Sequence, residues 1–345
     1  MERLRVHKEG ILLEKTNLYF ENEAVFNPAV IEESGIIHLF YRAFSKLKFS
    51  TIGYCRLDSP MNVINRDLTP FLVPQFEYEL KGLEDPRIVK IEDQYFLTYT
   101  AFDGLNALGA LSISSDLKEF KHWGIITPLI IENKDESEQV LRIGESYLSE
   151  LEKDRNVEFV WDKNVLFFPR KINGNFYYIH RIKPDILFVI VSDLTNLNVD
   201  FWKNYLSKLS EFRLDCKSID KENALYYGAG CPPIETKQGW IFIYHAAYEK
   251  ENELIYKAHC ILLDLNNPLK IIASLPYSLF EPEFDWEIEG DVKNVVFPTG
   301  CITRGDLIYI YYGAADSRIA CASFSMSELF ESFFYLKNEN EYAKK

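Results

Sequence analysis

Hydrophobic residues along this chain recur in short runs typical of β-strands, and helical spacing is scarce. The clearest runs lie at residues 35–45, 93–104, 174–185, 239–249 and 306–316, and their starts are 58, 81, 65 and 67 residues apart. Each run begins at a polar or glycine-containing turn, continues through aromatic and aliphatic residues, and ends on small or charged ones. Aromatic and β-branched residues favour strands, and a repeat of this length is typical of successive strand-built units.

Each of the five runs is flanked by further apolar segments. We expect preceding strands at residues 24–31, 86–91, 165–171, 231–235 and 295–302, and following strands at 50–56, 110–114, 258–264 and 319–324. Several strands per unit, repeated five times without long helices between them, predict an all-β fold, a five-bladed β-propeller. The alternative is a pair of two-sheet sandwiches whose segments resemble one another by accident.

We expect residues 1–345 to form a single propeller domain. The spacing is longest before the third unit because of a charged, acidic insertion at about 131–160, which is expected to be a solvated loop. Short helices are expected at residues 206–213 and near the C-terminus, at residues 325–334.

The charge of the chain argues against nucleic-acid partners. It has 52 acidic and 38 basic residues, a net charge of -14, and no stripe of Lys and Arg that would offset this field locally. The N-terminal residues lack the apolar core of a signal peptide, and apolar stretches such as residues 240–248 are less than half of a membrane span. We therefore expect a cytoplasmic protein that does not bind membranes.

The cysteines favour neither a disulfide framework nor a zinc site. The six lie far apart and include no Cys-x-x-Cys pair, so we interpret them as buried reduced thiols: Cys55, Cys216, Cys231, Cys260, Cys301 and Cys321. EF-hand, Walker and Rossmann signatures are also missing from the sequence, so neither a metal nor a nucleotide cofactor is expected.

Polar residues recur at one position of the five repeated runs. The matching pairs are Tyr41-Arg42, Tyr99-Thr100, His180-Arg181, Tyr244-His245 and Tyr312-Gly313. Because the inner strands of a propeller direct their ends at a central funnel, we expect these side chains to converge there. Scattered surface polar residues are the alternative.

Two acidic stretches precede such runs. Glu84-Asp85-Pro86-Arg87 would direct a carboxylate into the funnel with an arginine to balance or orient it, although Glu-Asp-Pro is also a common turn. Residues 286–300 place acids and amides before the last run. Carboxylates beside the aromatic rings of Trp123, Trp161 and Trp240 suit sugars, whose C–H faces stack while their hydroxyls form hydrogen bonds. Core aromatics and a solvated acidic loop would give the same pattern.

The chain resembles glycoside hydrolase family 130, the mannoside phosphorylases and β-mannosidases built on five-bladed propellers. The matching stretches run in order along nearly the whole chain. They are Phe-Asn-Pro-Ala at 26–29, Tyr-Arg-Ala at 41–43, Glu-Asp-Pro-Arg at 84–87, Tyr-Thr-Ala-Phe-Asp-Gly at 99–104, and the segments 163–169, 180–181, 228–234, 239–245, 262–265, 290–300 and 311–316.

The resemblance implies an inverting enzyme that cleaves β-mannosidic linkages of manno-oligosaccharides. Asp85 would be the general acid, and inorganic phosphate would be the co-substrate, which gives mannose 1-phosphate without any other cofactor. The residues implied to bind the mannoside are Asn27, Arg42, Glu84, Arg87, Asp291 and Asp316. Those implied to hold phosphate are Lys163, His180, Arg181, Tyr244 and His245. A homo-oligomer is left open.

Two departures from the family pattern keep hydrolysis as an alternative. Phosphorylases carry Lys-Asp-Ala where this chain has Lys163-Asn164-Val165, and many have an arginine where it has Leu108. A hydrolase needs a carboxylate base to activate water, and the insertion offers Glu138, Glu145 and Glu150. Phosphorolysis is the preferred interpretation, an inverting β-mannosidase is the second, and a non-catalytic sugar-binding propeller is the third.

Overall fold

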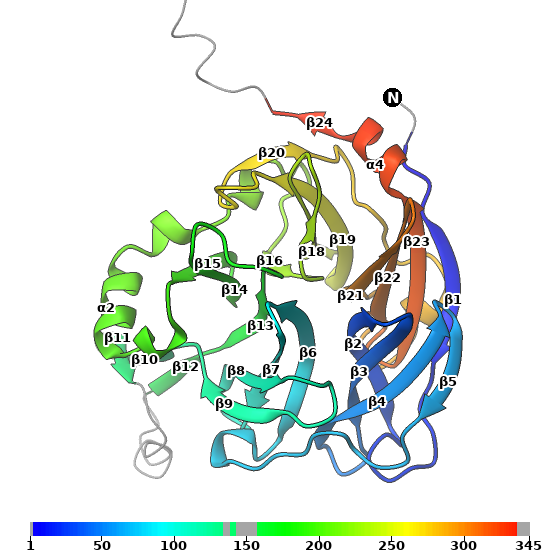
Figure 1. Ribbon diagram of the computed structural model, residues 1–345, viewed down its shortest axis with the longest axis horizontal. Helices are drawn as coiled ribbons and strands as arrows, with labels where there is room; N and C mark the ends of the chain where they lie inside the picture. The colour runs from blue at the N-terminus through cyan, green and yellow to red at the C-terminus, as the bar shows by residue number, and fades with distance from the viewer. Residues whose placement is uncertain (1–2, 134–138, 143–156, 337–345) are drawn as a thin grey trace, which may run out of the picture.

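Five blades surround a central axis in the computed structural model, which describes residues 3–133, 139–142 and 157–336 (Figure 1). The propeller predicted from the sequence is confirmed, and the sandwich alternative is wrong. The first blade is β2 (Ala24–Glu33), β3 (Ile36–Phe44), β4 (Ser50–Ser59) and β5 (Asn62–Arg66), and the second is β6 (Gly82–Ile91), β7 (Gln94–Phe102), β8 (Ala107–Ser114) and β9 (Lys121–Ile125).

The other three blades follow in chain order. The third blade is β13 (Asp162–Phe167), β14 (Phe176–Ile182) and β15 (Asp185–Val191). The fourth is β16 (Tyr226–Ala229), β17 (Ile234–Glu235), β18 (Trp240–Lys250), β19 (Glu253–Leu263), β20 (Ile271–Ser274) and β24 (Phe334–Tyr335), and the fifth is β21 (Val296–Arg304), β22 (Leu307–Ala314), β23 (Arg318–Ser325) and β1 (His7–Leu13). Because β1 pairs with β23, the first strand of the chain completes the last blade and closes the ring.

The strongest apolar runs are the second strands of the blades, not the innermost ones. The five repeated runs form β3, β7, β14, β18 and β22, whereas an earlier strand of each blade lies nearest the axis: β2, β6, β13, β16 and β21 (Figure 1). Consistent with a closed ring, β2 contacts both β21 and β6, and β13 contacts both β6 and β16. The Glu84-Asp85 motif consequently lies within an innermost strand, and not before it.

The hydrophobic core lies between neighbouring blades. Each of the five clusters of buried side chains joins two adjacent blades. Phe40 and Leu97 belong to the cluster between blades one and two, and Phe188 and Trp240 to the one between blades three and four. Burying a large apolar side chain stabilises the fold by roughly 1.5–3 kcal/mol, so these five interfaces hold the ring together.

Helices are short and lie outside the blades. They are α2 (Val199–Ser207), α3 (Asp285–Ile288) and α4 (Met326–Ser332), with 3-10 turns at Glu77–Glu79, Leu194–Asn196, Leu209–Phe212 and Cys216–Ser218. The C-terminal helix agrees with the prediction. The helix expected at residues 206–213 is wrong, because α2 begins before this range and ends at Ser207, and only a 3-10 turn follows it. Within the described ranges, no helix is long and apolar enough to cross a membrane.

The described parts of the acidic insertion form a small sheet instead of a loop. Strand β10 (Leu129–Asn133) pairs with β11 (Gln139–Arg142) on one side and β12 (Val157–Val160) on the other. All six cysteines are free, and five of them are buried as predicted, whereas Cys301 is only partly buried.

Candidate active site

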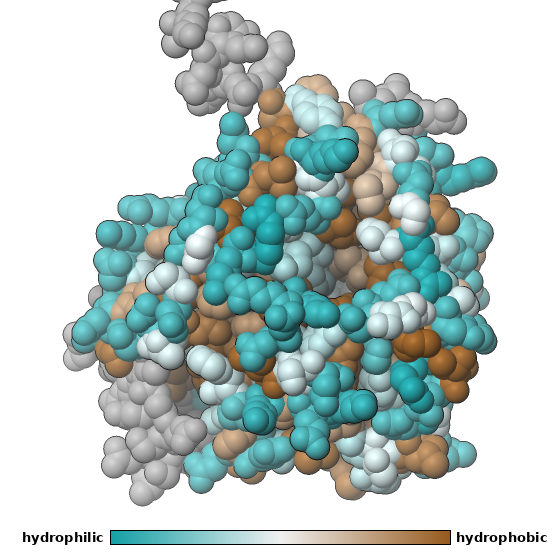
Figure 2. All heavy atoms as spheres, viewed as in Figure 1, coloured by the Kyte–Doolittle hydropathy of each residue, from teal (hydrophilic) through white to brown (hydrophobic). Residues whose placement is uncertain are grey.

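A cavity of about 720 Å³ opens at the centre of the propeller, and side chains from all five blades line it. In a view down the same axis as Figure 1, hydrophilic residues cover much of one face and surround a hollow near its middle (Figure 2). The lining consists of Asn27, Arg42, Asp85, Leu105, Val160, Trp161, Lys163, Asn164, Arg181, Lys183, Tyr226, Tyr256, Val292, Val295, Phe297 and Asp316.

Irregularities in three innermost strands carry polar side chains into the cavity. The pairing register shifts where Asn27, Asp85 and Asn164 occur, and these residues have φ angles of 49°, 47° and 59°. A β-bulge leaves a residue unpaired and redirects its side chain. Asn and Asp adopt this left-handed backbone more readily than most other residues with a Cβ, so the same local device serves blades one, two and three.

Blade five has a glycine where blade one has an arginine. Gly313 occupies in β22 the place that Arg42 occupies in β3. A Cβ atom at Gly313 would lie 1.9 Å from Oδ1 of Asn27. Glycine is therefore required there, because the Asn27 amide fills the volume next to it.

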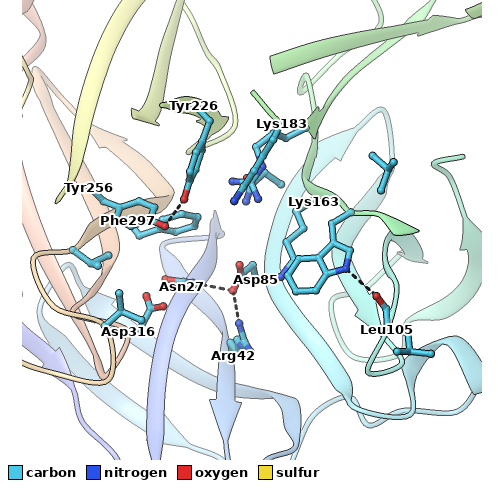
Figure 3. A pocket seen from close by; sticks show the side chains of 16 residues that line it. Asn27, Arg42, Asp85, Leu105, Lys163, Lys183, Tyr226, Tyr256, Phe297 and Asp316 are labelled. Atoms are coloured by element: carbon cyan, nitrogen blue, oxygen red, sulfur yellow. Dashed lines mark hydrogen bonds and ion pairs between the residues drawn. The ribbon is translucent and has the colours of Figure 1, made fainter. Parts of the chain in front are cut away.

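Asp85 lies at the floor of the cavity, with 8% of its surface exposed. Its Oδ1 accepts hydrogen bonds from Asn27 Nδ2 at 2.8 Å and from Arg42 Nη1 at 3.4 Å (Figure 3). Burial raises the pKa of Asp85, but the charges of Arg42 and Lys163 and the Asn27 hydrogen bond outweigh burial and hold the pKa below its usual range. Without ligand, Asp85 is therefore a carboxylate at neutral pH.

Asp316 is the second carboxyl group of the lining, and it has the opposite tendency. It lies in the turn between β22 and β23 and points into the same space as Asp85 (Figure 3). Burial, followed by the negative charge of Asp85, raises the pKa of Asp316 to about 7, even though Arg42 acts against this rise. At neutral pH, Asp316 is thus partly protonated and can donate a hydrogen bond.

Glu84 and Arg87 hold the acid in place from behind the cavity wall. Glu84 accepts hydrogen bonds from Arg42 Nη2 at 2.5 Å and from Lys163 Nζ at 3.1 Å. Arg87 is 1% exposed and donates from Nη1 to the carbonyl oxygens of Asp85 and Pro86, both at 3.0 Å. Arg87 therefore fixes the backbone of the bulge that carries Asp85.

The opposite wall of the cavity is cationic. Lys183 Nζ lies 4.2 Å from the ring centroid of Tyr226, and the guanidinium of Arg181 lies 5.4 Å from it. Burial, together with the charges of Arg181 and Lys163, lowers the pKa of Lys183. Nε of Arg181 is buried and makes no hydrogen bond to any described residue. Figure 3 shows Lys163 and Lys183 across the space from Asp316.

The comparison with protein families decides what this cavity belongs to. The family model described as β-1,4-mannooligosaccharide phosphorylase, of glycoside hydrolase family 130, matches residues 4–333. The chain belongs to glycoside hydrolase family 130. The relatives of this family that have described activities are glycoside phosphorylases. The chain is therefore a carbohydrate-active enzyme of the glycoside phosphorylase or hydrolase class.

Individual relatives of family 130 resemble the chain over most of its length. The 1,2-β-oligomannan phosphorylase of Thermoanaerobacter sp. (strain X514) is 33% identical over 94% of this chain and 98% of its own. The β-1,2-mannobiose phosphorylase of the same organism is 37% identical over 88% and 90%. The solved complex of the Listeria innocua β-1,2-mannobiose phosphorylase with β-1,2-mannobiose has a TM-score of 0.70 at 23% identity, over 95% of this chain and 99% of the other.

Six residues expected from the family 130 resemblance line the cavity together: Asn27, Arg42, Asp85, Lys163, Arg181 and Asp316. Glu84 and Arg87 lie directly behind them. Asp291 is exposed and does not line the cavity, although its charge contributes to the raised pKa of Asp316. The acids expected to act as a hydrolytic base, Glu138, Glu145 and Glu150, lie outside the described residues.

The structure does not bring His180 or Tyr244 into the cavity. Successive side chains of a strand point to opposite faces, so of His180 and Arg181 only one can reach the axis, and it is Arg181. His180 is fully buried, with Nδ1 at 2.6 Å from Asp162 Oδ2 and Nε2 at 2.7 Å from the Tyr205 hydroxyl. Tyr244 packs in the core between blades three and four.

His245 does not line the cavity but packs against a residue that does. Its ring centroid is 4.2 Å from that of Phe297, which lines the cavity, and it is 0% exposed. Burial and the charges of Arg181 and Arg87 hold the pKa of His245 well below its usual range, so the ring is neutral. It is therefore not a cationic phosphate ligand.

Several lining residues were not singled out as candidates from the sequence. Lys183 follows Arg181 by two positions, and this period-2 spacing could have revealed it. Tyr226 belongs to β16, which the apolar pattern missed, because the strand expected at residues 231–235 overlaps β17 instead. Of the three tryptophans proposed to face sugars, only Trp161 lines the cavity: Trp240 is fully buried, and Trp123 is exposed elsewhere.

Proposed function

We propose that the protein is a β-mannoside phosphorylase that cleaves β-1,2-linked manno-oligosaccharides and releases mannose 1-phosphate. The observation that carries the proposal is the division of the cavity into two walls. Carboxyl and amide groups lie with Arg42 on blades one, two and five, and Arg181 and Lys183 lie on blade three across the cavity from them. Lys163, also on blade three, reaches over to the acidic side, where it hydrogen-bonds Glu84. A sugar needs the first wall, and a phosphate dianion needs the second.

The cationic wall supports phosphorolysis over hydrolysis. An inverting hydrolase needs a second carboxylate, separated from the acid by enough space for a water molecule. Among the described residues, the carboxyl groups of the lining are Asp85 and Asp316, and both lie near Arg42 on the same wall. The position facing them holds Arg181 and Lys183, which suit an anionic nucleophile, and among the described residues it holds no second carboxylate to activate water.

The proposed reaction inverts the anomeric carbon in one displacement. A phosphate oxygen forms a bond to C1 of the terminal mannose, the C1–O bond to the next sugar breaks, and the departing oxygen receives a proton from Asp85. The products are α-mannose 1-phosphate and an oligosaccharide that is shorter by one mannose.

Phosphate binding also supplies the condition under which Asp85 can act as an acid. The carboxyl pKa is held low largely by Arg42 and Lys163. A dianion bound against Lys163 and Arg181 offsets part of this positive field and raises the pKa of Asp85 toward protonation. Asp85 is thus protonated when phosphate is bound. This coupling between phosphate binding and protonation disfavours turnover without phosphate.

The linkage is proposed from the relatives. Two of them, at 33% and 37% identity over 94% and 88% of this chain, are described as acting on β-1,2-linked mannosides. The matching family model is described by a β-1,4 activity, so the linkage needs its own test.

Product analysis tests the proposal. Incubating the protein with β-1,2- and β-1,4-mannobiose, each with and without inorganic phosphate, should give mannose 1-phosphate only from the β-1,2 substrate and only with phosphate. Release of free mannose at equal rates in both conditions would make the enzyme a hydrolase. Preference for the β-1,4 substrate would overturn the linkage alone.

A further inference from the structure

The mouth of the cavity carries a half-exposed tryptophan whose polar atom is already bonded. Nε1 of Trp161 donates to the carbonyl oxygen of Leu105 at 2.8 Å, and 47% of the residue remains exposed. The exposed part is therefore apolar ring surface beside a polar cavity. An indole with this exposure is unfavourable in water and suits the C–H face of a sugar.

The turn that holds the indole is itself fixed by side-chain hydrogen bonds. Asp103 Oδ1 accepts from the backbone N–H groups of Leu105 and Asn106, both at 2.7 Å, and Oδ2 accepts from Asn106 Nδ2 at 2.8 Å. Asn106 is 2% exposed. The turn between β7 and β8 thus presents the Leu105 carbonyl in one orientation, and the orientation of the indole follows from it.

Two further contacts define which surface of Trp161 is free. The ammonium of Lys163 lies 4.7 Å from the ring centroid, over one face of the indole. Phe102 meets the indole edge-on, with ring centroids 5.7 Å apart at 73°. The two contacts leave 47% of the residue exposed, and this surface is available to a ligand. Lys163 links the tryptophan to the acid through Glu84.

The depth of the cavity tells which sugar reaches this face. Asp85 lies at the floor and is 8% exposed, whereas Trp161 at the mouth is 47% exposed. In the proposed function, on which this inference rests, the terminal mannose occupies the floor. The next sugar of the chain then lies at the mouth, and it is the leaving group of phosphorolysis and the acceptor of the reverse reaction.

We propose that Trp161 is the stacking platform for this acceptor sugar, and that Asp103 and the Leu105 carbonyl position it. Trp161 is a specificity-determining residue in this role: it recognises the acceptor pyranose and not the terminal mannose or phosphate. Shortening the side chain should weaken binding of a disaccharide and leave binding of a single mannose unchanged.

Binding to an inactive background tests the platform independently of turnover. With Asp85→Asn present, calorimetry is performed with mannose, β-1,2-mannobiose and β-1,4-mannobiose. Trp161→Ala should weaken the affinity for the preferred disaccharide about tenfold, and Trp161→Phe should retain most of it. Mannose should bind equally to all three proteins. Trp123→Ala is the matched control, because Trp123 is also 47% exposed but lies outside the cavity.

The kinetic readout uses the active protein in the synthetic direction. Trp161→Ala should raise the KM for the acceptor sugar about tenfold, while the KM for mannose 1-phosphate stays within twofold. Asp103→Ala should shift the acceptor KM in the same direction by a smaller factor, and Asp103→Asn should restore it.

The outcomes separate this inference from the proposed function. Unchanged disaccharide affinity in Trp161→Ala, or an equal loss of mannose and mannobiose affinity, overturns the platform. A wild-type protein that never forms mannose 1-phosphate overturns phosphorolysis, and the binding comparison still decides the platform. Failure of both disaccharides to bind overturns the two together.

Discussion

Replacing Asp316 by asparagine should abolish one pH dependence of stability. In the native protein, burial and the charge of Asp85 raise the pKa of Asp316 from 3.8 to about 7. Below about pH 4 the group is protonated in both folded and unfolded chains and contributes no difference. Between pH 4 and 7 the unfolded chain releases the proton first, so the free energy of unfolding falls as pH rises.

The magnitude follows from the two pKa values. A rise from 3.8 to about 7 corresponds to at most about 4 kcal/mol of lost stability at pH 7 and above, at 1.36 kcal/mol per pH unit. Asparagine cannot ionise, and it tolerates the φ of 46° that Asp316 adopts in its turn. The variant should therefore gain stability relative to wild type as pH rises from 4 to 7, and the gain should level off above pH 7.

Melting temperatures at pH 4.5, 6, 7 and 8, taken at one scan rate, provide the assay. We expect Asp316→Asn to melt roughly 5 °C above wild type at pH 8 and close to it at pH 4.5. Asp93→Asn, at an exposed hairpin turn, is the control and should show no trend. A constant difference across this pH range, or a variant that is less stable at pH 8, would refute a raised pKa for Asp316.

Two other substitutions test the two walls, and a third tests a buried hydrogen bond outside the cavity. Asp85→Asn should lower kcat by about 10²–10⁴-fold in a protein that stays folded, and near-normal turnover would remove Asp85 as the acid. Arg181→Ala should raise the KM for phosphate at least about tenfold and leave mannose affinity within twofold, whereas Arg170→Ala on the exposed surface should change neither. Tyr205→Phe removes the hydroxyl at 2.7 Å from His180 Nε2 and should cost about 1 kcal/mol of stability, as urea unfolding measures; an unchanged unfolding free energy would mean that the hydrogen bond contributes nothing.

The sequence predicted the blades because each strand had a clear apolar pattern, but it misjudged which strand lies innermost. A second strand such as β18 is covered on both faces by neighbouring blades, so its apolar run is long: residues Trp240 to Tyr248 are all buried. The innermost strand β6 carries polar residues at its bulge, and these interrupt its pattern. The strength of the apolar pattern therefore indicated how deeply a strand is buried, and not how close it lies to the axis.

Only part of the site was predicted, because residue type indicates which side chains suit the chemistry but not which of them face the cavity. Residue type favoured both members of the pair His180-Arg181, yet opposite orientation in β14 allows only Arg181 to reach the cavity. The helix was misplaced for a related reason. The expected helix began at residue 206, whereas the start of α2 is set by Asn198, whose side chain accepts from the N–H of Phe201.

The bulges couple the backbone to the chemistry of the cavity. In a regular strand, only every second side chain points at the axis. A bulge lets a strand place a further side chain between those positions. At Asn27, Asp85 and Asn164 the chain adopts positive φ, which favours Asn and Asp among residues with a Cβ. The residue types that permit the bulge are also those that hydrogen-bond sugars and carry a catalytic proton. Backbone geometry thus favours amides, acids or glycine at these positions, and glycine would bring no polar group into the cavity. The acid Asp85 and its hydrogen-bond donor Asn27 therefore come from one repeated structural device on adjacent blades.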